Sequence, residues 1–120
     1  MSNTEFKEIK NIILEALENL KTLDVVSIDV SKKSNFTDLL LIGTGTSSTH
    51  IKAISNEVIE NIKKNGYEKT IRGVEVDSEW VLIDLYDIVI NIMINETREF
   101  YGLEKLWSID NNYKSEITSS

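Results

Sequence analysis

The stretch "TDLLLIGTG", residues 37–45, places four apolar residues in succession and closes with two glycines. A half-exposed strand alternates apolar and polar side chains, whereas a strand covered on both faces is apolar throughout. The stretch therefore predicts a central strand of a sheet, and the rest of the fold can be worked out from it.

Amphipathic helices are predicted on both sides of this strand. Apolar residues recur at helical spacing from residue 4 to residue 20, with Thr4 as the predicted N-cap. Beyond the glycines, Thr46, Ser47 or Ser48 is predicted to cap a second helix, which stops at Asn65 and Gly66. The apolar positions are Phe6, Ile9, Ile13, Ala16, Leu17 and Leu20 in the first helix and Ile51, Ile54, Val58 and Ile62 in the second.

Four further stretches are typical of strands. They are "DVVSIDV" (24–30), "KTIRGVEV" (69–76), "EWVLIDL" (79–85) and "DIVINIMI" (87–94). The glycine inside the second suggests a bulge or the close approach of another backbone. The last two lie close enough in sequence to form a hairpin. Alternation in the third sets one face against the other, with Trp80, Leu82 and Asp84 opposed to Val81, Ile83 and Leu85.

The order of these elements predicts an α/β (α+β) fold with a mixed sheet of about five strands flanked by helices. A final helix is expected over residues 95–107, capped by Asn95. We expect a single domain over residues 1–108 and a polar, flexible tail over residues 109–120.

Composition restricts the function further. The chain has no cysteine and one histidine, His50, so neither a disulfide framework nor a thiolate metal site is available, and no metal or cofactor is predicted. The net charge of -7 opposes binding to bare phosphate and favours a basic protein as partner. Without a membrane-length apolar segment or a signal peptide, we expect a cytoplasmic protein.

Two enzyme readings rest on weak patterns. The segment "GTGTSSTH" (43–50) resembles a phosphate loop but lacks the third glycine or the lysine of such loops, so a tight turn and a helix cap are favoured. A metal-dependent nucleotidyltransferase would use Glu75, Asp77 and Asp84 as its acids. However, 28 residues separate Ser47 from Glu75, where about a dozen would be typical.

Acidic residues gather around aromatic ones in the last third of the chain. Between residues 75 and 105 there are eight acids and only two bases, Arg98 and Lys105. The surplus surrounds Trp80, Tyr86, Tyr101 and Trp107. Such a patch suits docking, because burial of the rings gives affinity and the charges give orientation. In "REFYGLEKLW" (98–107), the apolar stripe is expected to seal the final helix to the sheet while Tyr101 and the acids face the partner.

Three stretches together resemble the ribosomal silencing factor family, also called the Iojap family, over residues 5–108. They are "TDLLLIGTGTSSTH", "GVEVDSEWVLIDLYDIVINIM" and "ETREFYGLEKLW". The residues that carry the resemblance, in order, are Thr37, Asp38, Gly45, Ser47, His50, Gly73, Trp80, Asp84, Asp87, Arg98, Tyr101, Leu103, Glu104, Leu106 and Trp107.

The resemblance implies a noncatalytic translation repressor that binds the large ribosomal subunit and sterically blocks its joining to the small one. Its implied partner is the fourteenth large-subunit protein, a basic protein, and its implied fold is a nucleotidyltransferase-like core without catalytic acids. No membrane and no sequence-specific nucleic acid is expected as partner, and a homodimer is compatible with this role. The partner-binding residues predicted on this basis are Trp80, Leu82, Asp84, Tyr101, Glu104, Leu106 and Trp107.

Two positions depart from the family's pattern. Tyr86 stands where many members have glycine, and Asn91 stands where many have histidine. A side chain at position 86 is expected to alter the hairpin, because residues other than glycine tolerate positive φ poorly. Asn91 argues against a catalytic or metal-binding role at its position.

Overall fold

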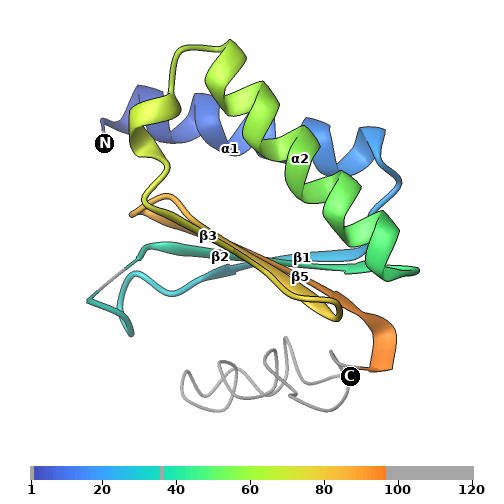
Figure 1. Cartoon of the computed structure of the whole chain (residues 1–120). Helices are drawn as coiled ribbons and strands as arrows, with labels where there is room; N and C mark the ends of the chain where they lie inside the picture. Colours follow the sequence, from blue (N-terminus) through green and yellow to red (C-terminus); the bar gives the residue numbers. More distant parts are fainter. Residues whose placement is uncertain (1, 36, 97–120) are drawn as a thin grey trace.

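The computed structural model describes residues 2–35 and 37–96, which form a five-stranded sheet with two α-helices on one face (Figure 1). The predicted α+β class is confirmed. The elements in chain order are α1 (Asn3–Asn19), β1 (Leu23–Asp29), β2 (Leu39–Gly45), α2 (Ser48–Lys64), the 3₁₀ turn η1 (Glu68–Thr70), β3 (Gly73–Val76), β4 (Trp80–Asp84) and β5 (Ile88–Ile94).

The sheet is mixed, with strand order β1-β2-β5-β4-β3. Its centre is the parallel pair β2 and β5, in which Leu39 lies opposite Ile88 and Gly45 opposite Ile94. The other three pairs are antiparallel. Every residue of β2 is buried, which confirms the central strand predicted from its unbroken apolar run.

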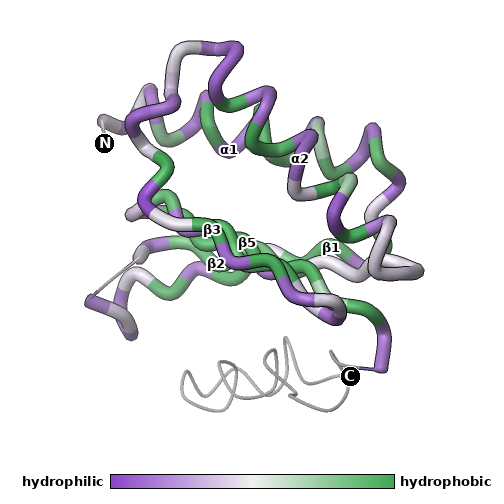
Figure 2. Tube along the Cα trace, in the orientation of Figure 1, coloured by the Kyte–Doolittle hydropathy of each residue, from purple (hydrophilic) through white to green (hydrophobic). Residues whose placement is uncertain are grey.

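The main core lies between the two helices and the sheet. Figure 2 shows hydrophobic residues concentrated along the central strands and on the helix surfaces that face them. All four apolar positions predicted for the second helix are fully buried. A second, smaller cluster lies on the other face of the sheet over β1 and β2, and its buried members are Ile28, Val30, Leu40 and Ile42.

The N-cap of α1 is Ser2, so the prediction of Thr4 was wrong. The Ser2 hydroxyl accepts a hydrogen bond from the backbone N–H of Glu5 at 3.1 Å. The Glu5 carboxylate accepts one in return from the Ser2 N–H, also at 3.1 Å. This reciprocal capping box satisfies two helix-end donors at once, which Thr4 cannot do because Lys7 follows three residues later.

The helix α2 begins and ends as its sequence predicts. Ser47 is the N-cap, and its hydroxyl accepts from the N–H of His50 at 3.1 Å. Asn65 is the C-cap, and Gly66 follows in the left-handed region with φ of 88°. The helix therefore stops where a residue without a side chain makes positive φ inexpensive.

The strand predicted over residues 69–76 is shorter than expected. Residues 69 and 70 belong to η1, where the Thr70 hydroxyl donates to the Tyr67 carbonyl at 2.7 Å, and β3 begins only at Gly73. A Cβ on Gly73 would meet no atom within 4 Å. The expected close approach of another backbone at this glycine is therefore not found.

The predicted final helix over residues 95–107 and the predicted domain boundary at residue 108 fall almost entirely outside the described residues. In the part of the chain that is described, no helix has both the length and the apolar character needed to cross a membrane.

Candidate functional site

The sheet face opposite the helices holds three of the predicted partner-binding residues. We call its β3 to β5 portion the Trp80 face. Trp80 lies opposite Met93, Leu82 opposite Asn91, and Asp84 opposite Val89. Because side chains alternate along a strand, all of these point away from the helices. The face comprises Gly73, Glu75, Trp80, Leu82, Asp84, Val89, Asn91 and Met93.

The predicted alternation of β4 is confirmed by its burial. Val81 and Ile83 are fully buried in the core under the helices, whereas Trp80, Leu82 and Asp84 are half-buried. No helix of the described chain covers the Trp80 face (Figure 1). Trp80 and Leu82 thus give this face an apolar centre that retains contact with solvent. Their role in binding a partner stays a prediction.

Asp84 is held by groups of its own chain. The Arg72 Nε lies 3.5 Å from its carboxylate, and the backbone N–H of Tyr86 donates to the same carboxylate at 3.0 Å. The Arg72 guanidinium also lies over the Tyr86 ring, 4.9 Å from its centre. Asp84 therefore presents less net charge to a partner than the sequence suggested. Through these two contacts, the Asp84 side chain orders the turn that joins β4 to β5.

Tyr86 occupies a conformation normally reserved for glycine. Its φ is 72°, and its side chain is 50% exposed. The strands β4 and β5 nevertheless pair in regular register up to Asp84 and Val89, so the side chain at position 86 does not disturb their pairing. The hydrogen bond to Asp84 and the stacking of Arg72 on the ring help to hold this unfavourable backbone.

The two glycines of the loop at residues 43–45 allow neighbouring side chains to pack closely against the backbone. A Cβ on Gly45 would lie 2.4 Å from the Ile51 Cγ2 and 3.3 Å from the His50 Nδ1. A Cβ on Gly43 would lie 2.7 Å from the Thr22 Cγ2. The space beside both glycines is thus filled by neighbouring side chains, and Ser47 caps the helix. This geometry favours the turn and cap over a phosphate cradle.

His50 joins this loop to the end of the first helix. Its Nδ1 accepts from the Thr46 N–H at 2.9 Å, and its Nε2 lies 2.7 Å from the Leu20 carbonyl. The two contacts together require an imidazole that is protonated on Nε2 and accepts at Nδ1. The predicted role of a surface residue at a helix start is therefore incomplete, because the ring also fixes two segments together. Sequence spacing carries no signal for such a contact.

The three acids of the enzyme alternative do not form a metal site. Glu75 and Asp84 lie on the Trp80 face, where Glu75 is exposed, while Asp77 lies in the turn after β3. Among residues 2–35 and 37–96, no three acids, histidines or cysteines are arranged to hold a metal ion. The geometry therefore gives the nucleotidyltransferase reading no support.

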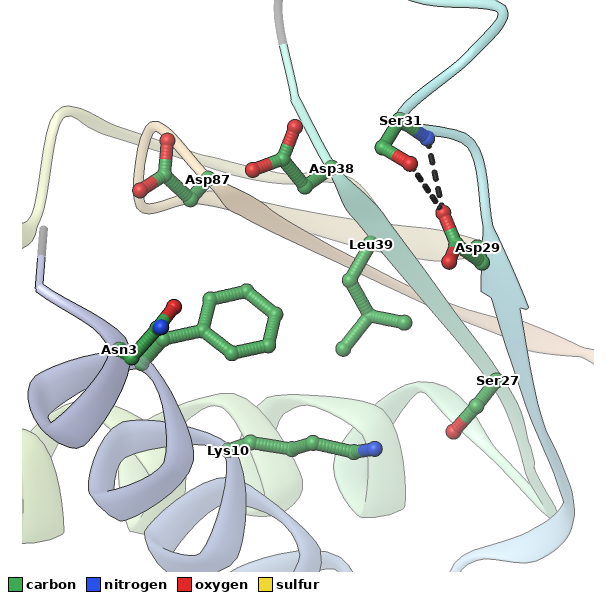
Figure 3. A pocket seen from close by; sticks show the side chains of 9 residues that line it. Asn3, Lys10, Ser27, Asp29, Ser31, Asp38, Leu39 and Asp87 are labelled. Atoms are coloured by element: carbon green, nitrogen blue, oxygen red, sulfur yellow. Dashed lines mark hydrogen bonds between the residues drawn. The ribbon is translucent and has the colours of Figure 1, made fainter.

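A polar pocket of about 420 Å³ lies on the helix side of the sheet, where the start of α1 meets β1 and β2 (Figure 3). Asp29, Asp38 and Asp87 line it, with Lys10 reaching in from α1. The backbone N–H of Ser31, followed by its hydroxyl, holds the pKa of Asp29 below its ordinary value of 3.8. The pocket contains none of the predicted partner-binding residues.

Asp87 connects this end of the sheet through its backbone. Its carbonyl accepts from the N–H groups of Asp38 and Leu39, at 2.9 and 3.0 Å. Two of the family-motif acids, Asp38 and Asp87, thus meet across the parallel pair although they are far apart in sequence. The remaining predicted partner-binding residues, Tyr101, Glu104, Leu106 and Trp107, lie outside the described residues.

The structure also reveals a feature that sequence reasoning missed. The Asn91 Oδ1 is buried and has no hydrogen-bond partner among the residues that the structure describes. Asn91 lies between Ile42 on β2 and Leu82 on β4, in the middle of the sheet. Burying an acceptor without a partner is costly, so an asparagine is an unusual residue at this central position of the sheet.

Comparison with known proteins agrees with this fold and these motifs. The family model described as "Ribosomal silencing factor during starvation" matches residues 3–120. The chain is 38% identical over 96 residues to ribosomal silencing factor RsfS of Haemophilus influenzae, covering 80% of this chain and 94% of the relative. It is 33% identical over 103 residues to the Chromobacterium violaceum factor of the same name, covering 86% and 84%.

A solved structure agrees as well. A crystal structure of a Chromobacterium violaceum protein superposes with a TM-score of 0.79 at 35% identity, covering 85% of each chain. The family name denotes a regulator associated with the ribosome. The chain therefore belongs to the ribosomal silencing factor family, as its motifs predicted.

Proposed function

We propose that this protein represses translation by docking its Trp80 face on a basic protein of the large ribosomal subunit. The bound protein then occupies space that the small subunit needs, so the two subunits do not join. The fourteenth large-subunit protein is the partner implied by the sequence resemblance. Membership of a family of ribosome silencing factors supports the ribosomal part of this proposal.

The observation that carries the proposal is the half-buried pair Trp80 and Leu82 on a sheet face without a covering helix in the described chain. A tryptophan in this setting is a typical interface anchor, because burying the rest of its ring removes a large apolar area from water. The neighbouring Glu75, Asp77 and Glu79 are exposed and supply negative charge. This charge complements a basic ribosomal protein and raises the rate of encounter.

The decisive test uses Trp80→Ala and a matched control, Tyr67→Ala. Tyr67 is also a half-buried aromatic, but it lies on the helix side, where its hydroxyl is hydrogen-bonded to Glu8. Loss of an anchor typically weakens binding by about 2 kcal/mol or more, roughly 30-fold. We expect that loss for Trp80→Ala in co-sedimentation with large subunits, and near-parental binding for Tyr67→Ala. Circular dichroism establishes that both variants are folded at the assay temperature.

Light scattering of mixed subunits tests the second half of the proposal. The parent protein and Tyr67→Ala should prevent subunit association, whereas Trp80→Ala should permit it at the same concentration. If Trp80→Ala binds and blocks joining as well as the parent, the Trp80 face is not the interface. Tight magnesium-dependent nucleotide binding in calorimetry would instead favour the enzyme alternative.

A further inference from the structure

Among residues 2–35 and 37–96, no strand pairs with the outer side of β3, which is an edge of the sheet. The strand order places it last, beyond β4, and all four of its residues are exposed. Val74 is 38% exposed and Val76 is 50% exposed. Val74 lies opposite the buried Ile83, and Val76 lies opposite the buried Val81. The two valines therefore lie on the same sheet face as the helices, but they are exposed.

The backbone of both valines also points outward. The Asp77 N–H donates to the Trp80 carbonyl at 2.8 Å, so the pair Asp77 and Trp80 is hydrogen-bonded. Bonded and non-bonded pairs alternate along an antiparallel ladder. The pair Glu75 with Leu82, two residues further along the ladder, is therefore bonded as well. The N–H and C=O groups of Val74 and Val76 consequently face away from β4, toward the open edge.

The opposite edge of the sheet lacks this regular geometry. In β1 the register shifts between Leu23 and Val26, and Asp24 has a φ of 48°. Such a bulge twists an edge strand and discourages pairing with another chain. In β3 the register runs without a shift from Gly73 to Val76, and the strand contains neither proline nor lysine. Of the two edges, β3 is the one suited to accept another strand.

The charged residues around β3 determine which partner sequence would pair with it favourably. Glu75 lies on the Trp80 face, opposite Leu82, and Asp77 and Glu79 lie at the hairpin end. Lys69 and Arg72 lie at the other end, where Arg72 is paired with Asp84. A partner strand that places a lysine or arginine opposite Glu75 gains a cross-strand ion pair, while residues opposite Val74 and Val76 need to be apolar.

We propose that β3 binds an extended segment of a basic protein as a sixth strand, with an apolar, basic, apolar sequence opposite Val74, Glu75 and Val76. The inference rests on the proposed function and adds to it, because the sixth strand extends the sheet whose Trp80 face meets the ribosomal protein. Main-chain hydrogen bonds from the valines supply affinity, and Glu75 supplies selectivity. A second copy of this chain fits less well, since it carries the same acidic edge and the same charge of -7.

Amide hydrogen exchange of the full chain, alone and with purified large ribosomal subunits, tests this directly. Fragmentation in the mass spectrometer resolves single amides. We expect the Val74 and Val76 amides to exchange rapidly in the free protein and at least about tenfold more slowly in the complex. Docking of the Trp80 face alone would leave these two amides fast, because they point sideways from the sheet.

A pair of variants at one position separates backbone from side chain. Proline at an edge position whose N–H faces outward removes a donor without breaking the internal ladder. Val76→Pro should therefore keep the fold by circular dichroism but weaken binding to large subunits about tenfold or more. Val76→Thr keeps the N–H and the branched shape, so its binding should stay within about threefold of the parent.

The outcomes distinguish this inference from the function it rests on. If the parent binds in a Trp80-dependent way but the two amides stay unprotected and Val76→Pro binds normally, the sixth strand is excluded and the proposed function stands. If the parent does not bind large subunits, both fail. If the amides become protected in the protein alone as its concentration rises, β3 pairs with a second copy and the basic-segment proposal is overturned.

Discussion

The two faces of β4 differ in burial along a strand of only five residues. Toward the helices, Val81 and Ile83 are fully buried and belong to the main core. Toward the other side, Trp80, Leu82 and Asp84 remain half-buried on a face that no described helix covers. The comparison teaches that core packing and the proposed binding surface are separated here by the pleat of the strand rather than by position along the chain.

Alanine substitutions at the neighbouring positions 82 and 83 of β4 should show the largest difference between the two faces. Ile83→Ala removes a fully buried side chain, and such changes cost about 2–5 kcal/mol of unfolding free energy. Leu82→Ala removes a half-buried one and should cost about 1 kcal/mol while impairing binding to large subunits. Urea unfolding measures the first effect and co-sedimentation the second. Equal destabilisation by both variants would show that the two faces are not distinct in packing.

Two glycines provide the next largest contrast. Gly45 lies against α2, where a Cβ would come within 2.4 Å of Ile51, whereas a Cβ on Gly73 would meet nothing within 4 Å. We expect Gly45→Ala to destabilise by about 2 kcal/mol through overpacking. Gly73→Ala should stay within about 0.5 kcal/mol of the parent. Thermal unfolding of both variants tests this, and a neutral Gly45→Ala would mean that α2 has room to move.

The smallest expected effect concerns the turn beside the Trp80 face. Tyr86 has positive φ, which costs a residue with a Cβ roughly 1–2 kcal/mol. Both Tyr86→Ala and Tyr86→Gly lose the ring stacked on Arg72, but only glycine removes the strain. Tyr86→Gly should therefore be more stable than Tyr86→Ala by about 1 kcal/mol in urea unfolding. The reverse order would show that the turn relaxes to a different backbone when the ring is absent.

Much of the fold follows from local sequence patterns. The apolar run at residues 39–42 predicted a buried central strand, and alternation predicted both faces of β4. These predictions succeed because the number of buried faces of a strand determines the order of apolar and polar residues along it. The cap at Ser47 and the stop at Gly66 likewise follow from the chemistry of helix ends.

Other features depend on contacts that no local pattern records. The start of β3 was misplaced because η1 takes up residues that have strand-like propensity. The contacts of the Asp84 carboxylate with Arg72 and with the Tyr86 N–H were not foreseen, and its predicted role in partner binding stays a prediction. The link from His50 to Leu20 joins segments 30 residues apart. Each of these is decided by tertiary neighbours, which is why charge and spacing alone did not identify them.

The parallel pair at the centre of the sheet has a consequence for how the molecule assembles. β1 pairs with β2, and β3, β4 and β5 form a meander, so both units are built from neighbours in sequence. Joining them requires Leu39 to find Ile88 across a long intervening chain, which carries the largest loop-closure entropy. We expect β2 and β5 to pair late in folding, and we expect this step to set the folding rate. The meander that carries Trp80 and Leu82 would then form before it is anchored to β2.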